Sequence, residues 1–256
     1  MTVRALSFGA IAQAYESFRA EYPEELFEAV ADYAGGTPRT ALEIGAGTGK
    51  ATRLFVRHGV EVTATDPDPG MLAELRKNVP GVAHTMQATL EDMRPDGGTY
   101  GLVFVAAALH WTRAEGRWER VAALLEPGGV FASFVGPFRP ADPAVVEAVR
   151  LARAPFLADD EIPSPDGTPY EADMKWPGTE LLRSSLFTDV RQVTIERRFT
   201  LSARGYGDYL STVSAYLQLP EAERRRALDA IMQALPANVE ITADVIGHLA
   251  RRRPEA

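Results

Sequence analysis

The chain has 256 residues, of which 46% are hydrophobic and 24% are charged, with 21 glycines and 18 prolines. These proportions are typical of a globular protein and exclude collagen-like, low-complexity and wholly disordered chains. The 35 acidic residues outnumber the 27 basic ones, so the formal net charge is -8. Proteins that follow a phosphate backbone usually carry the opposite charge, and we therefore expect no nucleic-acid partner.

The chain contains no cysteine, which excludes disulfides, cysteine-ligated metals and thiol nucleophiles. Its four histidines show no tight ligand spacing, so no metal site is expected. The first eight residues lack the apolar core of a signal peptide, and the longest apolar run, residues 102–109, is far shorter than the ~20 residues that span a bilayer. We expect a cytoplasmic protein with no membrane partner.

The predicted elements change character along the chain. Two helices are predicted at the start, over residues 10–19 and 23–33. From residue 40 to 134, short apolar runs alternate with helical stretches, which is the pattern of βαβ units on a parallel sheet. The predicted strands are residues 40–44, 61–65, 82–88, 100–106 and 130–135; the predicted helices between them are 51–58, 68–78 and 113–125, with a turn at 126–129.

The C-terminal half breaks this alternation. Residues 137–178 contain eight prolines and no strand pattern, and they predict an inserted cap with one helix, 143–157, and a long loop. Beyond the cap, the predicted elements are a strand at 190–200, helices at 207–217 and 221–234, and a last strand at 239–249.

A glycine-rich segment, Glu43-Ile44-Gly45-Ala46-Gly47-Thr48-Gly49, directly follows the first predicted strand and precedes a helix. Glycines at this place let the backbone turn tightly and approach a ligand. A dinucleotide fingerprint needs a third glycine where Lys50 stands, and a P-loop needs another spacing and a hydroxyl residue where Ala51 stands. With both phosphate-binding motifs excluded, the segment predicts a site for a nucleotide-like cofactor that need not contain a pyrophosphate.

The ends of the next two strands agree with this interpretation. Asp66 ends the second strand, where a carboxylate can accept both hydroxyls of a ribose. The third strand ends at Gln87-Ala88-Thr89-Leu90, where the edge of a base can lie against backbone and small side chains. Because these strand ends lie side by side in a doubly wound sheet, we expect a ribose and a base to bind there.

Taken in order, four segments resemble the motifs of class I S-adenosylmethionine-dependent methyltransferases, most closely the small-molecule, type 11-like subgroup. They are residues 43–49, Asp66, Ala106-Ala107-Ala108-Leu109-His110-Trp111 and Leu125-Glu126-Pro127-Gly128-Gly129, and residues 8–23 resemble the lid of that subgroup. The resemblance covers about half the chain and implies a single α/β domain with a Rossmann-like, doubly wound, mostly parallel seven-stranded sheet. Its expected parts are a helical lid (1–34), a cofactor-binding core (35–136), an inserted cap (137–186) and C-terminal strands and helices (187–256).

The resemblance also implies S-adenosyl-L-methionine as the cofactor. Relatives commonly carry an acid where this chain has Thr89, so adenine recognition there would rest on a hydroxyl and the backbone. The implied cofactor-binding residues are Gly45, Ala46 and Gly47 along the methionine moiety, Asp66 on the ribose, Pro67 and Met71 near the adenine, and further Tyr15, Arg19, Glu43, Gly49, Ala88, Thr89, Leu90 and Ala106.

Two pairs of side chains have alternative interpretations. Tyr15 and Arg19 share one helix face, so Arg19 either clamps the cofactor carboxylate with Tyr15 closing over it, or both belong to a solvated face. His110 and Trp111 follow the fourth strand, where the chain order reverses. His110 is a candidate general base or a fixed hydrogen-bond partner in the pocket, and the candidate substrate-binding residues are Trp111, Trp176 and Tyr209.

The expected activity is methyl transfer to an O, N or C nucleophile of a small organic molecule by a monomer or homodimer. One alternative is a protein that binds the cofactor without methyl transfer, as a sensor or a non-methylating enzyme, because cofactor motifs indicate binding and not turnover. An NAD(P)-dependent oxidoreductase is a further alternative, against which Lys50 and the lack of a Tyr-x-x-x-Lys pair argue.

Overall fold

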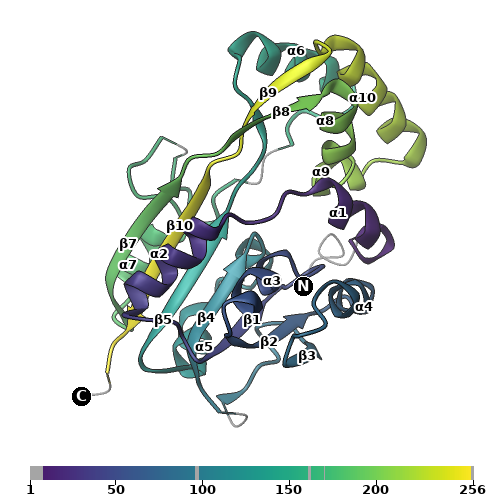
Figure 1. The fold of residues 1–256 in the computed structure, drawn as a ribbon. Coiled ribbons are helices and arrows are strands. Elements are labelled where there is room, and N and C mark those ends of the chain that lie inside the picture. Colours follow the sequence, from purple (N-terminus) through teal and green to yellow (C-terminus); the bar gives the residue numbers. More distant parts are fainter. Residues whose placement is uncertain (1–7, 96–97, 161–162, 170, 255–256) are drawn as a thin grey trace.

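A seven-stranded sheet forms the centre of the computed structural model, which describes residues 8–95, 98–160, 163–169 and 171–254. The strand order is β3-β2-β1-β4-β5-β10-β7 (Figure 1). Strands β1 to β5 pair in parallel, whereas β10 is antiparallel to both β5 and β7. This confirms the predicted Rossmann-like, mostly parallel α/β sheet. Its strands are β1 (Thr40–Ile44), β2 (Glu61–Asp66), β3 (His84–Gln87), β4 (Tyr100–Ala106), β5 (Leu125–Val135), β7 (Phe187–Ile195) and β10 (Val245–Arg252).

Helices cover both faces of this sheet because each buries one apolar stripe. On one face, α2 (Glu24–Ala34), α3 (Lys50–Arg57) and α4 (Pro69–Asn78) pack over Phe104 and Phe134. On the other, α5 (Arg117–Leu124) and α7 (Gly178–Arg183) pack over Phe131. In the described part of the chain, no helix is long and apolar enough to cross a membrane.

The lid segment begins, as far as it is described, with the 3-10 turn η2 (Gly9–Ile11) and helix α1 (Ala12–Phe18). Ion pairs hold it against the helix that follows the glycine loop. Lys50 Nζ, in a side chain only 8% exposed, lies 3.4 Å from a Glu16 carboxylate oxygen and 3.0 Å from one of Glu21. Arg53 pairs with the same two acids at 2.8 and 2.6 Å. The lid is therefore tied to the first turn of α3.

A smaller antiparallel sheet lies beyond the main one, at the top of Figure 1, in the order β6-β9-β8. It has its own core, which includes Phe138, Tyr216 and Ile231. We call these strands and their helices the cap unit. It comprises β6 (Arg139–Pro140), α6 (Pro143–Arg153), β8 (Arg198–Ser202), α8 (Ala203–Leu210), α9 (Ser214–Leu217), α10 (Glu221–Ala234) and β9 (Asn238–Thr242).

The strands of the cap unit differ from the predicted ones. A short strand, β6, lies within the proline-rich segment for which no strand was predicted. The single strands predicted at 190–200 and 239–249 are each two strands, β7 with β8 and β9 with β10, that belong to different sheets. At the break, the Asp244 carboxylate accepts the backbone N–H of Arg197 at 2.9 Å. The chain thus changes sheets without a glycine or proline to indicate it.

Three predicted helices also have different limits. Helix α5 begins at Arg117 and not at residue 113, because Gly116 before it has a left-handed backbone with φ of 68°. Helix α6 ends at Arg153 and not at 157. The helix predicted at 207–217 is broken into α8 and α9, and the Thr212 hydroxyl between them donates to the Tyr209 carbonyl at 2.7 Å. The predicted turn at 126–129 lies inside β5, where Gly128 has φ of 76°.

Candidate functional site

A pocket opens at the carboxyl ends of β1, β2 and β4, where doubly wound sheets bind ligands. About 740 Å³ of space without protein atoms lies within it, part of it open to solvent. Residues from the lid, from the glycine loop and from the ends of four strands meet here. The lining residues are Phe8, Tyr15, Ile44, Gly45, Gly47, Asp66, Pro67, Met71, Ala88, Thr89, Leu90, Glu91, Ala106, Ala107, Ala108, Trp111 and Thr112.

The glycine loop brings its backbone directly to this pocket. Gly45 has φ of +69°, and a Cβ there would lie 2.4 Å from the Ala108 Cβ, so no larger residue fits. Gly47 has φ of +56°, and the place of its missing Cβ has no atom within 4 Å. The loop therefore forms an open cradle, and a ligand can approach its backbone closely at Gly47.

Asp66 lies beside this cradle and is 8% exposed. Its two carboxylate oxygens accept backbone N–H groups, Oδ2 from Gly47 at 2.9 Å and Oδ1 from Asp68 at 2.8 Å. Burial raises the pKa of Asp66 to about 6, although these two hydrogen bonds act in the opposite direction. The geometry leaves a fixed carboxylate on the pocket wall with lone pairs available to hydroxyl groups.

Other predicted residues of the loop support the pocket without lining it. Glu43 is fully buried, and its Oε2 accepts the Thr52 hydroxyl at 2.5 Å, which joins β1 to α3. Burial raises the pKa of Glu43 to about 8, and the charge of Asp66 adds to this. Ala46 donates its N–H to the Thr65 carbonyl at 2.8 Å, and Gly49 stands at the N-terminal cap of α3.

The far end of the pocket combines apolar side chains, such as Met71 and Leu90, with a polar turn at Thr89. Thr89 donates its N–H and hydroxyl to Asp92 Oδ2, at 3.0 and 2.7 Å. This turn brings Glu91 to the pocket wall, where Glu91 Oε1 accepts the Arg113 N–H at 2.6 Å. Burial alone would raise the pKa of Glu91, but the hydrogen bond from Arg113 contributes to holding it below its usual value. An acidic residue thus stands two positions after Thr89.

The two lid residues predicted to bind the cofactor have different surroundings. Tyr15 lines the pocket next to Phe8, with ring centroids 5.9 Å apart. The Arg19 guanidinium lies 5.1 Å from the Tyr15 ring and 4.6 Å from the Tyr209 ring. It donates to the Thr212 hydroxyl at 2.8 Å and to the Thr212 carbonyl at 2.9 Å. Arg19 therefore bridges the lid to the cap unit, one aromatic ring away from the pocket.

The segment after β4 forms another wall. Ala107 has an uncommon φ of 53° and donates its N–H to the Phe134 carbonyl at 2.8 Å. The 3-10 turn η4 (Leu109–Trp111) follows, in which the His110 and Trp111 rings lie 4.4 Å apart. Trp111 and the next residue, Thr112, line the pocket, whereas His110 is not among the lining residues.

Two candidate substrate residues lie outside the pocket. Trp176 packs against the sheet face that α5 and α7 cover, with the Arg117 guanidinium 5.3 Å from its ring. Tyr209 is buried in the cap unit, where its ring stacks on Phe138 at 4.3 Å and its hydroxyl accepts the Phe138 N–H at 3.1 Å. The structure therefore does not bring Trp176 and Tyr209 to the pocket that contains Asp66.

Several lining residues were not in the predicted set. The only indication of them in the sequence was that most stand next to a predicted residue. Glu91 had a further signal, the Thr-x-x-Asp sequence of a side-chain-capped turn. The unpredicted lining residues are Phe8, Ile44, Glu91, Ala107, Ala108 and Thr112.

Comparisons with known proteins place this architecture in a family. A family model described as a methyltransferase domain matches residues 41–129. The chain is 30% identical over 232 residues to an uncharacterized methyltransferase from Mycobacterium tuberculosis, covering 90% of this chain and 86% of that one. It is 32% identical over 124 residues to a trans-aconitate 2-methyltransferase from Rhodopseudomonas palustris, covering 47% and 48%.

A solved structure agrees with these sequence matches. A candidate type II methyltransferase from Anaeromyxobacter dehalogenans matches with a TM-score of 0.64 and 25% identity, covering 93% of this chain and all of that one. The full-length sequence match, the strand order and the glycine loop agree with one another. The chain belongs to the class I S-adenosylmethionine-dependent methyltransferases.

Proposed function

We propose that this methyltransferase binds S-adenosylmethionine in the pocket at Asp66 and transfers its methyl group to an O, N or C nucleophile of a small organic molecule. The observation that carries the proposal is the fixed, buried Asp66 carboxylate between the open backbone of Gly47 and an apolar wall. A carboxylate at this place binds ribose hydroxyls, and Met71 and Leu90 offer apolar surface for a base.

The cofactor would supply an activated methyl group on a sulfonium. The residues of this chain then need to bind, orient and exclude water, since alignment inside a desolvated pocket lowers the barrier to transfer. Tyr15 on the lid and Trp111 on the turn after β4 line the pocket. His110 lies on the same turn but does not line the pocket, and its role as a base or a fixed hydrogen-bond partner stays a prediction.

Two observations support a small-molecule substrate. The acidic chain has a net charge of -8, which disfavours nucleic acid. The Rhodopseudomonas palustris relative is named for trans-aconitate, a small organic acid. Because that match covers 47% of this chain, it supports the substrate's size class and not its identity.

Thermal unfolding tests the cofactor assignment with S-adenosylmethionine, S-adenosylhomocysteine (the demethylated product) and NAD at equal concentrations. A ligand at 100 times its dissociation constant adds about 2.7 kcal/mol to the free energy of unfolding, which corresponds to a rise in Tm of about 5–10 °C for this chain length. We expect that rise with the two sulfur compounds only, and a rise of about half or less in Asp66→Ala, which removes charged hydrogen bonds of about 1.5–3 kcal/mol. A rise with NAD alone would contradict the proposal.

Radiolabelled methyl transfer to a panel of small organic acids, amines and phenols then tests the reaction.

A further inference from the structure

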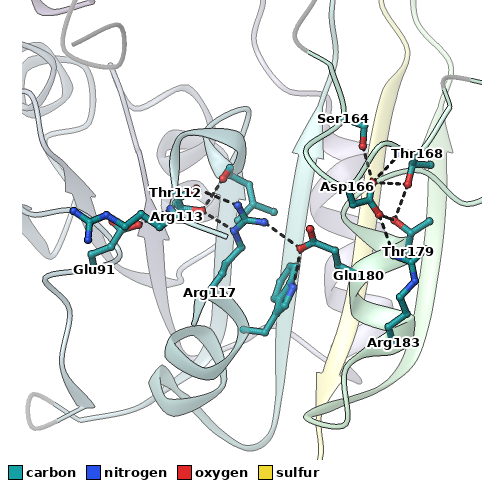
Figure 2. Close-up of polar contacts among 12 residues, drawn as sticks. Glu91, Thr112, Arg113, Arg117, Ser164, Asp166, Thr168, Thr179, Glu180 and Arg183 are labelled. Atoms are coloured by element: carbon teal, nitrogen blue, oxygen red, sulfur yellow. Dashed lines mark hydrogen bonds and ion pairs between the residues drawn. The ribbon is translucent and has the colours of Figure 1, made fainter. Parts of the chain in front are cut away.

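A buried arginine, Arg117, contacts Thr112, which lines the pocket (Figure 2). Its side chain is 1% exposed. Arg117 Nε donates to the Thr112 hydroxyl at 2.8 Å, and Nη2 donates to the Thr112 carbonyl at 3.0 Å. The same Thr112 hydroxyl donates to the Leu109 carbonyl at 2.7 Å. The guanidinium therefore holds Thr112 directly, and the Thr112 hydroxyl joins this end of the turn to Leu109 at the other.

The third nitrogen of Arg117 has a charged partner from a distant part of the sequence. Arg117 Nη1 donates to Glu180 Oε2 on α7 at 3.0 Å, and the Trp118 indole N–H donates to the same oxygen at 2.9 Å. Figure 2 shows Glu180 on the side of Arg117 that is turned away from Thr112. The Trp176 ring lies 5.3 Å from the guanidinium. The ion pair thus joins α7 to the turn through one side chain.

Residues that line the pocket lie on the turn that Arg117 holds and next to it. Trp111 and Thr112 of the turn line it, and so does Glu91, which accepts the Arg113 N–H at 2.6 Å. Burial lowers the pKa of Arg117, whereas the charges of Glu180 and Glu91 act against that shift. Glu180 pairs with the guanidinium directly, and the negative charge of Glu91 also favours its charged form.

Stability alone is a weak reason for such a pair. A buried ion pair loses the hydration of both charges, and well-packed apolar residues of similar volume often stabilise a fold as well or better. What a planar guanidinium adds is a fixed fork of donors. Two arms of this fork hold one residue that lines the pocket, so the geometry favours a role in shaping the pocket.

We propose that Arg117, held by Glu180, is a positioning residue that fixes the turn from Leu109 to Thr112 as a wall of the cofactor pocket. This inference rests on the proposed function for its binding readout. It adds a role for two residues, Arg117 and Glu180, that touch neither the pocket space nor the predicted cofactor-binding residues.

The test compares Arg117→Met with a matched control, Arg153→Met. Arg153, on α6 of the cap unit, forms a largely buried ion pair with Asp160, with side chains 13% and 18% exposed, and neither residue lines the pocket. We expect Arg117→Met to weaken S-adenosylhomocysteine binding at least tenfold by calorimetry, and Arg153→Met to leave it within twofold even where it lowers Tm as much. Equal binding by Arg117→Met and the wild type would overturn the proposal. If Arg117→Met does not fold, the Arg117→Met/Glu180→Gln double variant, which removes both charges, replaces it.

Two further variants separate geometry from charge. Arg117→Lys keeps the charge but not the fork, and we expect most of the loss in affinity to remain; wild-type affinity would overturn the proposal. If Arg117 acts through Thr112, adding Thr112→Val to Arg117→Met weakens binding by less than a further twofold. Fully additive losses would show that Arg117 acts by another route.

A readout without ligand keeps this test separate from the proposed function. The chain has three tryptophans, so 5-fluorotryptophan labelling gives three ¹⁹F resonances that Trp→Phe variants assign. We expect the Trp111 resonance to broaden or shift in Arg117→Met and to stay unchanged in Arg153→Met. An unchanged Trp111 resonance in Arg117→Met overturns the positioning role, whether or not the wild type binds S-adenosylhomocysteine.

Discussion

Asp66 combines burial with two backbone hydrogen bonds, from Gly47 in the glycine loop and from Asp68. The carboxylate is 8% exposed, and burial raises its pKa from 3.8 to about 6. Because the folded state then holds its proton more tightly than the unfolded state, the contribution of Asp66 to the free energy of unfolding falls as pH rises from about 4 through about 6. A ligand whose hydroxyls donate to the ionised carboxylate offsets this cost.

The raised pKa predicts a pH dependence of cofactor binding. If only the ionised carboxylate binds the ribose, the dissociation constant of S-adenosylhomocysteine should be about tenfold larger at pH 5 than at pH 7, with the change centred near pH 6. Calorimetric titration measures it directly, in a range below the usual α-amino pKa of about 7.7–8.0. Asp66→Asn is the control, since its weaker binding should not vary over this range. Equal wild-type affinity at pH 5 and 7 would show that Asp66 does not bind the ribose in ionised form.

At this scale the glycine loop and the end of β2 could be predicted, whereas Ile44 at the end of β1 and several loop residues were missed. Gly45, Gly47 and Asp66 reach the pocket because they directly follow β1 or end β2. Glu91 reaches it only through the turn that Thr89 and Asp92 close, and a pattern of residue types does not give the path of such a loop. Trp176 was predicted from its aromatic character alone, which does not distinguish a pocket from a core.

The lid and the cap unit meet through Arg19, and this contact depends on a helix break. Because α8 and α9 are separated at Thr212, that residue can present both its hydroxyl and its carbonyl to Arg19. In the part of the chain that the structure describes, no carboxylate forms an ion pair with Arg19. Its positive charge thus has only neutral partners, next to the Tyr15 ring that lines the pocket.

If Arg19 binds the cofactor carboxylate, its loss should have an effect that the loss of a contact between lid and cap unit would not have. Arg19→Ala should weaken S-adenosylhomocysteine binding by about 1.5 kcal/mol, or about tenfold, as a lost hydrogen bond to a charged group. Binding of 5′-methylthioadenosine, which lacks the carboxylate, should not change. Thr212→Val, which leaves the charge of Arg19 in place, is the matched control for the lid contact. If Arg19→Ala weakens both ligands equally, Arg19 only holds the lid.

The elements of the first 135 residues could be predicted well because the βαβ pattern alternates clearly, and Asp68 marks the start of α4 as its N-terminal cap. Later elements were harder. Strands β7 and β8 form one continuous run of strand-forming residues, and only the tertiary contact of Asp244 with the Arg197 N–H separates them. Such a contact between residues 47 positions apart has no local signal.

The whole molecule consists of two sheets that share continuous stretches of chain. Strand β7 runs into β8, and β9 runs into β10, so two adjacent connections cross between the main sheet and the cap unit (Figure 1). The Ala243 N–H donates to the Arg197 carbonyl at 2.8 Å and joins these two crossings. A cap that is attached in this way cannot lose its order without freeing the ends of β7 and β10.

We therefore predict that the core and the cap unit unfold together as a single domain. The three tryptophans, Trp111, Trp118 and Trp176, lie outside the cap unit, whereas its helices α6, α8 and α10 contribute to far-UV circular dichroism. Urea unfolding followed by tryptophan fluorescence and by circular dichroism should give the same midpoint and slope.

Ile231→Ala in the cap core makes this test sharper. Ile231 is fully buried on α10, so the truncation should lower the free energy of unfolding by about 2–5 kcal/mol. Since continuous stretches of chain join the two sheets, the midpoint from tryptophan fluorescence should fall as far as the midpoint from circular dichroism. A shift seen by circular dichroism alone would mean that the cap unit unfolds separately. In that case the lid contact at Thr212 would also be lost first, and the pocket would open before the core unfolds.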